Sequence, residues 1–336
     1  MDPELGRNIV ELGMVKNIRV EGKRATIEVA LTVKGCPLQS KIKDDIRREV
    51  KTVPGIDSVE VIFGEMTAEE RGAVAALARG ERPPEAFPRT TVIAVGSGKG
   101  GVGKSTLTVN LAFALHDLGH SVGIMDADVY GFSVPRLMGL KGEQPTALDE
   151  HTILPLVQGG VKMISAGSFF AENQPLIWRG PILARIVEQF TYDVVWGDPE
   201  FLLIDLPPGT GDIPLTIMQL IPKAHFLLVT TPQELAESVA VRIGHMAEVA
   251  KVRNLGIIEN MSYFICDQCG TKHLLFGEGE TDKLAAELNV PVLGRIPFRK
   301  AVAQHGDAGE PAQAAAALPE FQAIATRVLE ELHRQG

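Results

Sequence analysis

The sequence predicts an α/β fold, in which a mostly parallel sheet has helices on both faces and is preceded by a small α+β domain. From residue 91 onward, short apolar runs alternate with helical stretches. Runs this apolar are typical of strands covered on both faces, so the sheet should be mostly parallel. The predicted strands are residues 91–95, 121–125, 161–165, 201–204, 225–230, 256–259 and 290–294.

The N-terminal region has a different pattern. After a short helix, residues 14–20 and 24–31 form a predicted hairpin, because apolar residues alternate with polar or small ones along the second run. A helix that ends at Val50 and a strand over residues 58–63 follow. This mixture predicts a small α+β domain.

The boundary between the domains is predicted at residues 80–90, which are rich in proline and charge. That composition is typical of a semi-rigid connector. At 336 residues, the chain is long enough for one large domain and a smaller companion. The predicted domains are therefore 1–79 and 91–336.

Composition excludes several classes of function. A net charge of −9 argues against a nucleic-acid-binding surface, which needs a basic footprint. No basic membrane-surface helix is evident, since the C-terminal amphipathic stretch contains Glu320, Glu330 and Glu331. The N-terminus has no secretory pattern, so we expect a cytoplasmic protein that contacts neither nucleic acid nor membrane.

The strongest motif follows the first apolar run of the larger domain. Glycines between a buried strand and a helix start expose backbone N–H groups to phosphates. Lys104 would neutralise the outer phosphates, and Ser105 would hold Mg²⁺. A chance match in a glycine-rich turn is the alternative. The predicted ATP-binding loop is Gly98, Lys99, Gly100, Gly101, Val102, Gly103, Lys104, Ser105 and Thr106.

Lys99 is one lysine more than such a loop needs. Because Lys104 already serves the phosphates of its own loop, Lys99 is free to point outward. By analogy with an arginine finger, it would neutralise charge on the phosphates of a partner subunit. Hydrolysis would then depend on a homodimer. A solvated surface lysine is the alternative.

Acidic residues at two strand ends complete the predicted nucleotide site. Asp205 follows a buried strand and would hold Mg²⁺. Asp126 and Asp128 follow another, and we assign Asp126 to the Mg²⁺ shell and Asp128 to the attacking water. Either could instead cap the next turn. Gly209, in the loop after Asp205, is the expected sensor of the terminal phosphate.

The chain has three cysteines, and two of them form a close pair. Cys266 and Cys269 are spaced to ligate one metal centre, and His273 could add a third ligand. Two thiolates are half a site, which a C₂ dimer would complete. Zinc, an iron–sulfur cluster and redox-active or buried thiols all remain open. Cys36 stands apart, either as a reactive thiol or as a small buried residue.

Together these residues resemble the Mrp/ApbC family of iron–sulfur cluster carrier ATPases, within the deviant Walker A group that includes MinD, ParA and the nitrogenase iron protein. The N-terminal domain, with Cys36 in its Gly-Cys-Pro loop, looks like a small iron–sulfur maturation domain. Further family motifs are the Asp-Ala-Asp-Val-Tyr-Gly run at 126–131, Trp-Arg-Gly-Pro at 178–181, residues 205–212 and Glu-Asn-Met-Ser at 259–262.

The resemblance implies roles for single residues. Lys99 would be the signature lysine acting across the dimer, and Asn260 would help to recognise adenine. Cys266 and Cys269 would share a bridging four-iron cluster with the partner subunit. Two departures are Asp267, where many relatives have proline after the first cysteine, and Phe132, where proline usually follows Tyr-Gly.

We therefore expect a homodimeric ATPase that carries an iron–sulfur cluster, works with cluster assembly factors and transfers the cluster to apo-proteins. One alternative is a positioning ATPase like ParA or MinD, which needs a basic surface for DNA or membrane. Another is an ATPase whose cysteines form a structural zinc clamp between subunits.

Overall fold

The computed structural model describes residues 7–32, 39–79, 86–129, 131–169, 180–233, 245, 247–250, 252–266, 268–277, 281–316 and 318–335. Several residues singled out in the sequence lie outside this set, namely Cys36, Tyr130, Trp178, Arg179 and Asp267. The chain divides into two compact units. The first comprises Met1–Arg82, Pro145–Pro155 and Tyr192–Gly197, and the second comprises the remainder.

The first unit contains a three-stranded sheet in the order β1-β2-β3. Strands β1 (Val15–Glu21) and β2 (Arg24–Leu31) form the expected antiparallel hairpin. Strand β3 (Ser58–Glu65) pairs with β2 in parallel, which helix α1 (Gln39–Val50) makes possible as the crossover. Where the short N-terminal helix was predicted, residues 9–13 form turns, and residues 1–6 lie outside the described set.

The first unit is completed by helix α2 (Ala68–Arg79) and by the short antiparallel pair β6 (Thr146–Asp149) and β7 (Thr152–Leu154). Thr67 and Glu70 cap α2 reciprocally: the backbone N–H of each donates to the other's side chain, at 2.8 and 3.2 Å. Leu148 and Leu154 join the hydrophobic core of this unit, far from its other members in sequence.

The second unit is built on an eight-stranded sheet in the order β15-β12-β11-β4-β10-β5-β9-β8. All neighbours pair in parallel except β8 and β9. The strands are β4 (Thr91–Ser97), β5 (Val122–Asp126), β8 (Leu156–Gln158), β9 (Val161–Ser165), β10 (Phe201–Asp205), β11 (His225–Thr230), β12 (Arg253–Glu259) and β15 (Val292–Arg295).

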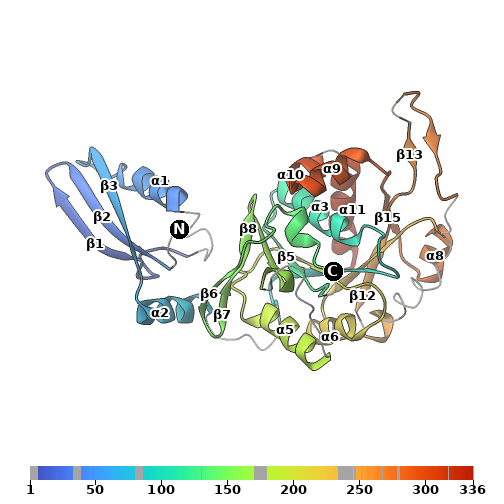
Figure 1. Ribbon diagram of the computed structural model, residues 1–336, viewed down its shortest axis with the longest axis horizontal. Coiled ribbons are helices and arrows are strands. Elements are labelled where there is room, and N and C mark those ends of the chain that lie inside the picture. Colours follow the sequence, from blue (N-terminus) through green and yellow to red (C-terminus); the bar gives the residue numbers. More distant parts are fainter. Residues whose placement is uncertain are drawn as a thin grey trace. The chain divides into compact units, whose positions relative to one another are not determined.

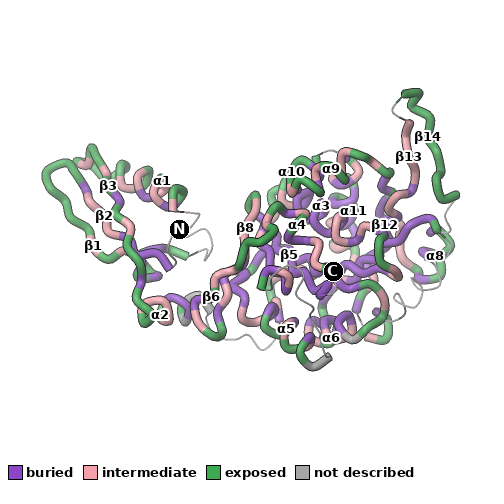
Figure 2. The backbone as a smooth tube through the Cα atoms, in the orientation of Figure 1, coloured by how far each residue is buried: buried purple, intermediate pink, exposed green. Residues whose placement is uncertain are grey.

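Every apolar run predicted as a strand of this sheet is one, so the α/β fold class is confirmed. The central strands are buried along their length (Figure 2). Only β8, from a stretch without a clear periodic signal, was missed within the sheet.

Helices cover both faces of the sheet, as Figure 1 shows. One group comprises α3 (Lys104–Asp117), α4 (Val134–Leu137), α9 (Lys300–Ala308), α10 (Pro311–Ala316) and α11 (Pro319–Gln335). The other includes α5 (Gly180–Tyr192) and α6 (Asp212–Leu220). A 3₁₀ turn spans Ala166–Ser168, and α8 (Thr281–Glu287) lies between β12 and β15 in sequence.

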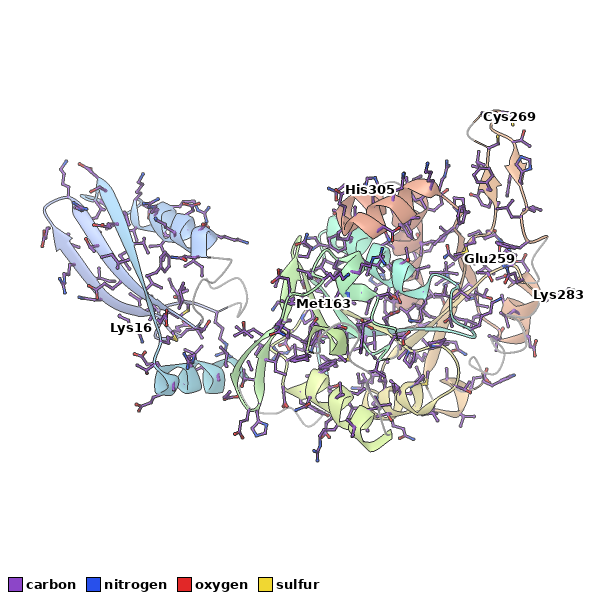
Figure 3. The ribbon with its side chains drawn as sticks, viewed as in Figure 1. Lys16, Met163, Glu259, Cys269, Lys283 and His305 are labelled. Atoms are coloured by element: carbon purple, nitrogen blue, oxygen red, sulfur yellow. The ribbon has the colours of Figure 1, made fainter. Side chains whose placement is uncertain are left out.

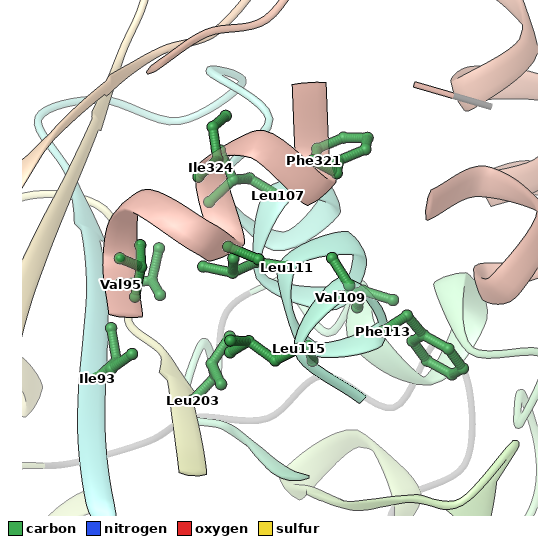
Figure 4. Close-up of a cluster of buried hydrophobic side chains, with 14 of the residues drawn as sticks. Ile93, Val95, Leu107, Val109, Leu111, Phe113, Leu115, Leu203, Phe321 and Ile324 are labelled. Atoms are coloured by element: carbon green, nitrogen blue, oxygen red, sulfur yellow. The ribbon is translucent and has the colours of Figure 1, made fainter. Parts of the chain in front are cut away.

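Helix α3 is the centre of the core, because almost all of it is buried. Leu107, Leu111 and Leu115 face the sheet and α11, whose Phe321 and Ile324 close the cluster (Figure 4). This packing holds the N-terminus of α3 at the carboxyl end of β4. The register also sets Asp205 beside Asp126 at the same edge, where ligands bind in such sheets.

Within the described residues, no helix is long and apolar enough to cross a membrane.

Leu111 gives a direct test of this core. Leu111→Ala should lower the free energy of unfolding by about 2–5 kcal/mol, because it leaves a cavity at a fully buried position. Leu118→Ala is the matched control, since Leu118 is 44% exposed at the end of the same helix. Urea denaturation of both variants measures the difference. Equal losses would show that α3 is not packed as described.

Candidate functional site

Residues 98–103 connect β4 to α3 and form the predicted phosphate loop. Gly101 and Gly103 have φ angles of 80° and 82°, which side chains other than glycine rarely adopt. A Cβ on Gly103 would also lie 2.2 Å from Nδ2 of Asn260. Glycine is therefore required at position 103 both by the backbone and by its neighbour.

Lys104 occupies a buried charge network at the start of α3. Its Nζ lies 2.8 Å from Oδ1 of Asp205 and 3.7 Å from Oδ2 of Asp128. Ser105 donates to the other oxygen of Asp205 at 2.5 Å, and Thr108 donates to Oδ1 at 3.0 Å. The structure thus brings Lys104, Ser105 and Asp205 together as predicted. Thr108, one turn into the helix, was missed.

A cavity of about 340 Å³ opens above this network. It is lined by the loop residues 99–106 and by Asp128, and Pro208 closes another side. Gly209 has a φ of 88°, but its backbone N–H donates to the carbonyl of Ser97 at 2.9 Å. To contact a phosphate, as predicted, that N–H has to release Ser97.

Asp126 and Asp128 differ in position. Asp126 is fully buried, with its oxygens accepting from the Ser165 hydroxyl at 2.9 Å and from the backbone N–H of Asp128 at 3.1 Å. Burial, and then the nearby Asp205 carboxylate, raise the pKa of Asp126 well above its usual value. Asp128 instead lines the cavity. Asp126 therefore caps the turn that leads to Asp128, while its assignment to the Mg²⁺ shell stays a prediction.

Lys99 is half-buried and pairs within its own chain. Its Nζ donates to Oε1 of Gln233 at 2.6 Å, where Gln233 follows the end of β11. The side chain is thus held beside the cavity that it lines. To reach another subunit, Lys99 has to break its hydrogen bond with Gln233. Nothing in the sequence indicated that Gln233 would bind Lys99, because the two residues are 134 positions apart.

A second cavity, of about 130 Å³, shares Gly103 and Thr106 with the first. Asn260 forms part of its wall, with Nδ2 donating to the carbonyl of Val102 at 2.8 Å. Apart from Arg299, the remaining lining residues are apolar: Leu107, Met261, Ile296, Pro297, Phe298, Val302, Ala303, Leu318 and Phe321. An apolar pocket beside a phosphate loop suits a nucleotide base. Of its lining, only Gly103, Thr106 and Asn260 were among the predicted nucleotide-binding residues.

The cysteine pair lies in a hairpin formed by β13 (Phe264–Ile265) and β14 (Lys272–His273), which projects from the sheet (Figure 3). Cys266 is half-buried and Cys269 is exposed, and neither forms a disulfide. Sγ of Cys269 lies 3.2 Å from the hydroxyl oxygen of Thr271, and this contact lowers the pKa of the Cys269 thiol.

Among the described residues, no group of three histidine, cysteine or carboxylate side chains is placed to hold a metal ion. His273 therefore does not add the third ligand that its spacing suggested, and its ring instead lies 6.4 Å from that of Phe264. One chain presents two thiols and no more in the described part of this site.

Comparison with known proteins identifies the family. Residues 89–333 match the model of the NUBPL iron-transfer P-loop NTPases. The chain belongs to this family. Residues 1–63 match the iron–sulfur cluster assembly protein family, in line with the resemblance of the N-terminal domain. As a member of the NUBPL iron-transfer family, the chain is a nucleotide-binding P-loop NTPase.

Curated relatives cover most of the chain. An iron–sulfur cluster carrier protein of Mycobacterium leprae is 44% identical over 93% of this chain and 84% of its own length. Its counterpart in Bacillus subtilis is 41% identical over 89% of this chain and 85% of its own length.

Solved structures agree with the family assignment. A nucleotide-binding protein from Archaeoglobus fulgidus, solved with ADP, is 38% identical with a TM-score of 0.60, covering 69% of this chain and 90% of that one. The Aquifex aeolicus MinC:MinD complex matches at 21% identity with a TM-score of 0.55, covering 73% and 96%. The MinD likeness shows the fold alone.

The raised pKa of Asp126 predicts a pH dependence of stability. The folded chain keeps a proton there that the unfolded chain releases above about pH 4, so the free energy of unfolding falls as pH rises from that value. Asp126→Asn cannot ionise and should lose less stability between about pH 5 and pH 8. Asp117→Asn, at the exposed end of α3, is the control. Parallel pH profiles for wild type and Asp126→Asn would refute a raised pKa at Asp126.

Proposed function

We propose that the protein is an ATP-hydrolysing carrier that holds an iron–sulfur cluster between two copies of itself and transfers it to apo-proteins. One observation carries the proposal: a phosphate loop with an additional lysine and a hairpin with only two thiols occur in the same chain. Each feature calls for a second subunit. The iron-transfer family and the carrier proteins among its relatives support the cargo.

Magnesium and ATP fit the residues present. The hydroxyl of Ser105 and the carboxylate of Asp205 are the oxygen donors that Mg²⁺ prefers. Lys104 lies under the loop where the outer phosphates would bind, and Asn260 borders the cavity suited to adenine. Asp128 lines the phosphate cavity and would orient the attacking water.

Lys99 would supply a positive charge that the nucleotide site of a single chain lacks. We assign it to the phosphates of the partner subunit, where its charge would offset the charge that develops as the terminal phosphate leaves. In the single chain Gln233 holds Lys99 by one hydrogen bond at 2.6 Å. Both groups are near solvent, so exchanging this bond for a phosphate costs little.

The cysteine hairpin would hold the cargo. A four-iron cluster takes four thiolates, and Cys266 and Cys269 of two subunits related by a C₂ axis provide them. The lowered pKa of Cys269 favours the thiolate form that ligates iron. Exposure of Cys269 leaves the cluster accessible to an acceptor protein or to an assembly factor. Free thiols suit a reducing compartment, so we place the carrier in the cytoplasm.

Separating binding from hydrolysis tests the nucleotide site. Lys104→Ala should abolish tight ATP binding, because it removes the charge under the phosphates. Lys99→Ala should bind ATP normally but lose hydrolysis, by about a thousandfold if Lys99 matches an arginine finger. Calorimetry and phosphate release measure the two effects. Wild-type hydrolysis by Lys99→Ala would remove the role in trans.

Iron uptake tests the cargo. After anaerobic reconstitution with iron and sulfide, a Cys266→Ala, Cys269→Ala double variant should bind no cluster, whereas Cys36→Ala, which keeps the pair, should match wild type. Elemental analysis and the visible spectrum are the readouts. Equal iron in the double variant contradicts the proposal, and stoichiometric zinc in anaerobically purified protein would favour a structural clamp instead.

A further inference from the structure

The wall of the second cavity and the root of the cysteine hairpin are made by the same two chain segments. Residues 260–263 leave the end of β12, line the cavity at Asn260 and Met261, and continue directly into β13. Residues 296–299 leave the neighbouring strand β15 and also line the cavity. Both segments therefore contact whatever fills the cavity.

Backbone hydrogen bonds join these segments from the sheet to the hairpin. Ile296 N–H donates to the carbonyl of Glu259 and Ser262 N–H to that of Ile296, each at 2.9 Å. Phe298 N–H then donates to the carbonyl of Tyr263 at 2.7 Å, and Phe298 also bridges Phe264 in parallel. The ladder of β12 and β15 thus continues past the cavity into the first residues of β13.

Side chains stiffen this connection. Glu259 is buried and accepts a hydrogen bond from Ser262, while Nε of Arg295 lies 3.5 Å from its carboxylate. At the hairpin, the ammonium of Lys272 lies 4.1 Å from the centre of the Tyr263 ring, which ties the returning strand to the root. These contacts, with the backbone hydrogen bonds, connect the cavity wall to the hairpin root.

Phe298 belongs both to the lining of the second cavity and to the root of the cysteine hairpin. Phe298 lines the cavity and its side chain is 45% exposed, so a planar ligand that packs against its ring would cover an aromatic surface. Its backbone bonds to Tyr263 at the hairpin root. A nucleotide base that packs against Phe298 would therefore order the hairpin root of the same chain through the hydrogen bond to Tyr263.

We propose that Phe298 is a positioning residue through which the base of the bound nucleotide, and not its phosphates alone, restrains the cysteine hairpin. The inference rests on the proposed function in that it gives the carrier a route from nucleotide to cargo within one subunit. By linkage, a cluster bound at the hairpin changes the affinity for adenine nucleotides by the same factor as the nucleotide changes the affinity for the cluster.

The first experiment compares ligands with and without a base on the cluster-free protein. Alkylation of Cys266 and Cys269 by iodoacetamide is followed by peptide mass spectrometry. Saturating ADP should slow alkylation roughly fivefold or more, the lower range of measured couplings between sites, whereas tripolyphosphate, shown to bind by competition with ATP, should not. Sedimentation confirms that ADP leaves the association state unchanged. Equal slowing by tripolyphosphate, or none by ADP, overturns the proposal.

The second experiment changes the route. At saturating ADP, the cysteines of Phe298→Ala should be alkylated as fast as those of the nucleotide-free protein. Phe298→Tyr keeps the aromatic ring, so its cysteines should stay protected by ADP. Leu275→Ala is the matched control, since Leu275 is 54% exposed beyond β14 and does not line the cavity. Full protection in Phe298→Ala would overturn the role. Because no cluster is present, failure of cluster transfer would not alter either result.

Discussion

The site depends on the buried ion pair between Lys104 and Asp205. Lys104 is only 6% exposed, and its charge is balanced at 2.8 Å by a carboxylate with no exposure at all. Removing either partner would leave an uncompensated buried charge, so the pair fixes the phosphate loop against β10. The same pairing has a functional consequence. A lysine already neutralised within its own chain cannot alone balance a triphosphate, so we propose that Mg²⁺ and Lys99 supply the further positive charge.

The nucleotide site and the cysteine hairpin each lack a group that their proposed roles require. The nucleotide site has a lysine held by Gln233 at 2.6 Å, and the cysteine hairpin presents two thiols without a third ligand in the described residues. The proposed C₂ dimer would complete both with one operation, since each copy would provide what the other lacks. The proposed route through Phe298 would join the two sites within the chain, so nucleotide and cargo would not communicate only through the proposed dimer interface.

Much of this architecture is predictable from the sequence, because buried strands and a phosphate loop are local patterns. The strands of the main sheet match apolar runs, and Lys104, Ser105 and Asp205 follow strand ends that meet at one edge. Contacts between distant segments are not local and were missed: Lys99 with Gln233, 134 residues away, and Phe298 with Tyr263. The hydrogen bond from Asp128 N–H to the Asp126 carboxylate was foreseen only as an alternative. It depends on the burial of Asp126, which is not a local property of the sequence.

A mixed-subunit assay tests most directly whether the catalytic site is shared. Lys99→Ala retains its own Asp128, and Asp128→Asn retains its own Lys99, so both should bind ATP while neither hydrolyses it alone. If Lys99 acts on the partner, an equal mixture makes half of the dimers mixed, each with one complete site, and regains about a quarter of the wild-type rate. A mixture no more active than its separate components would contradict the shared site.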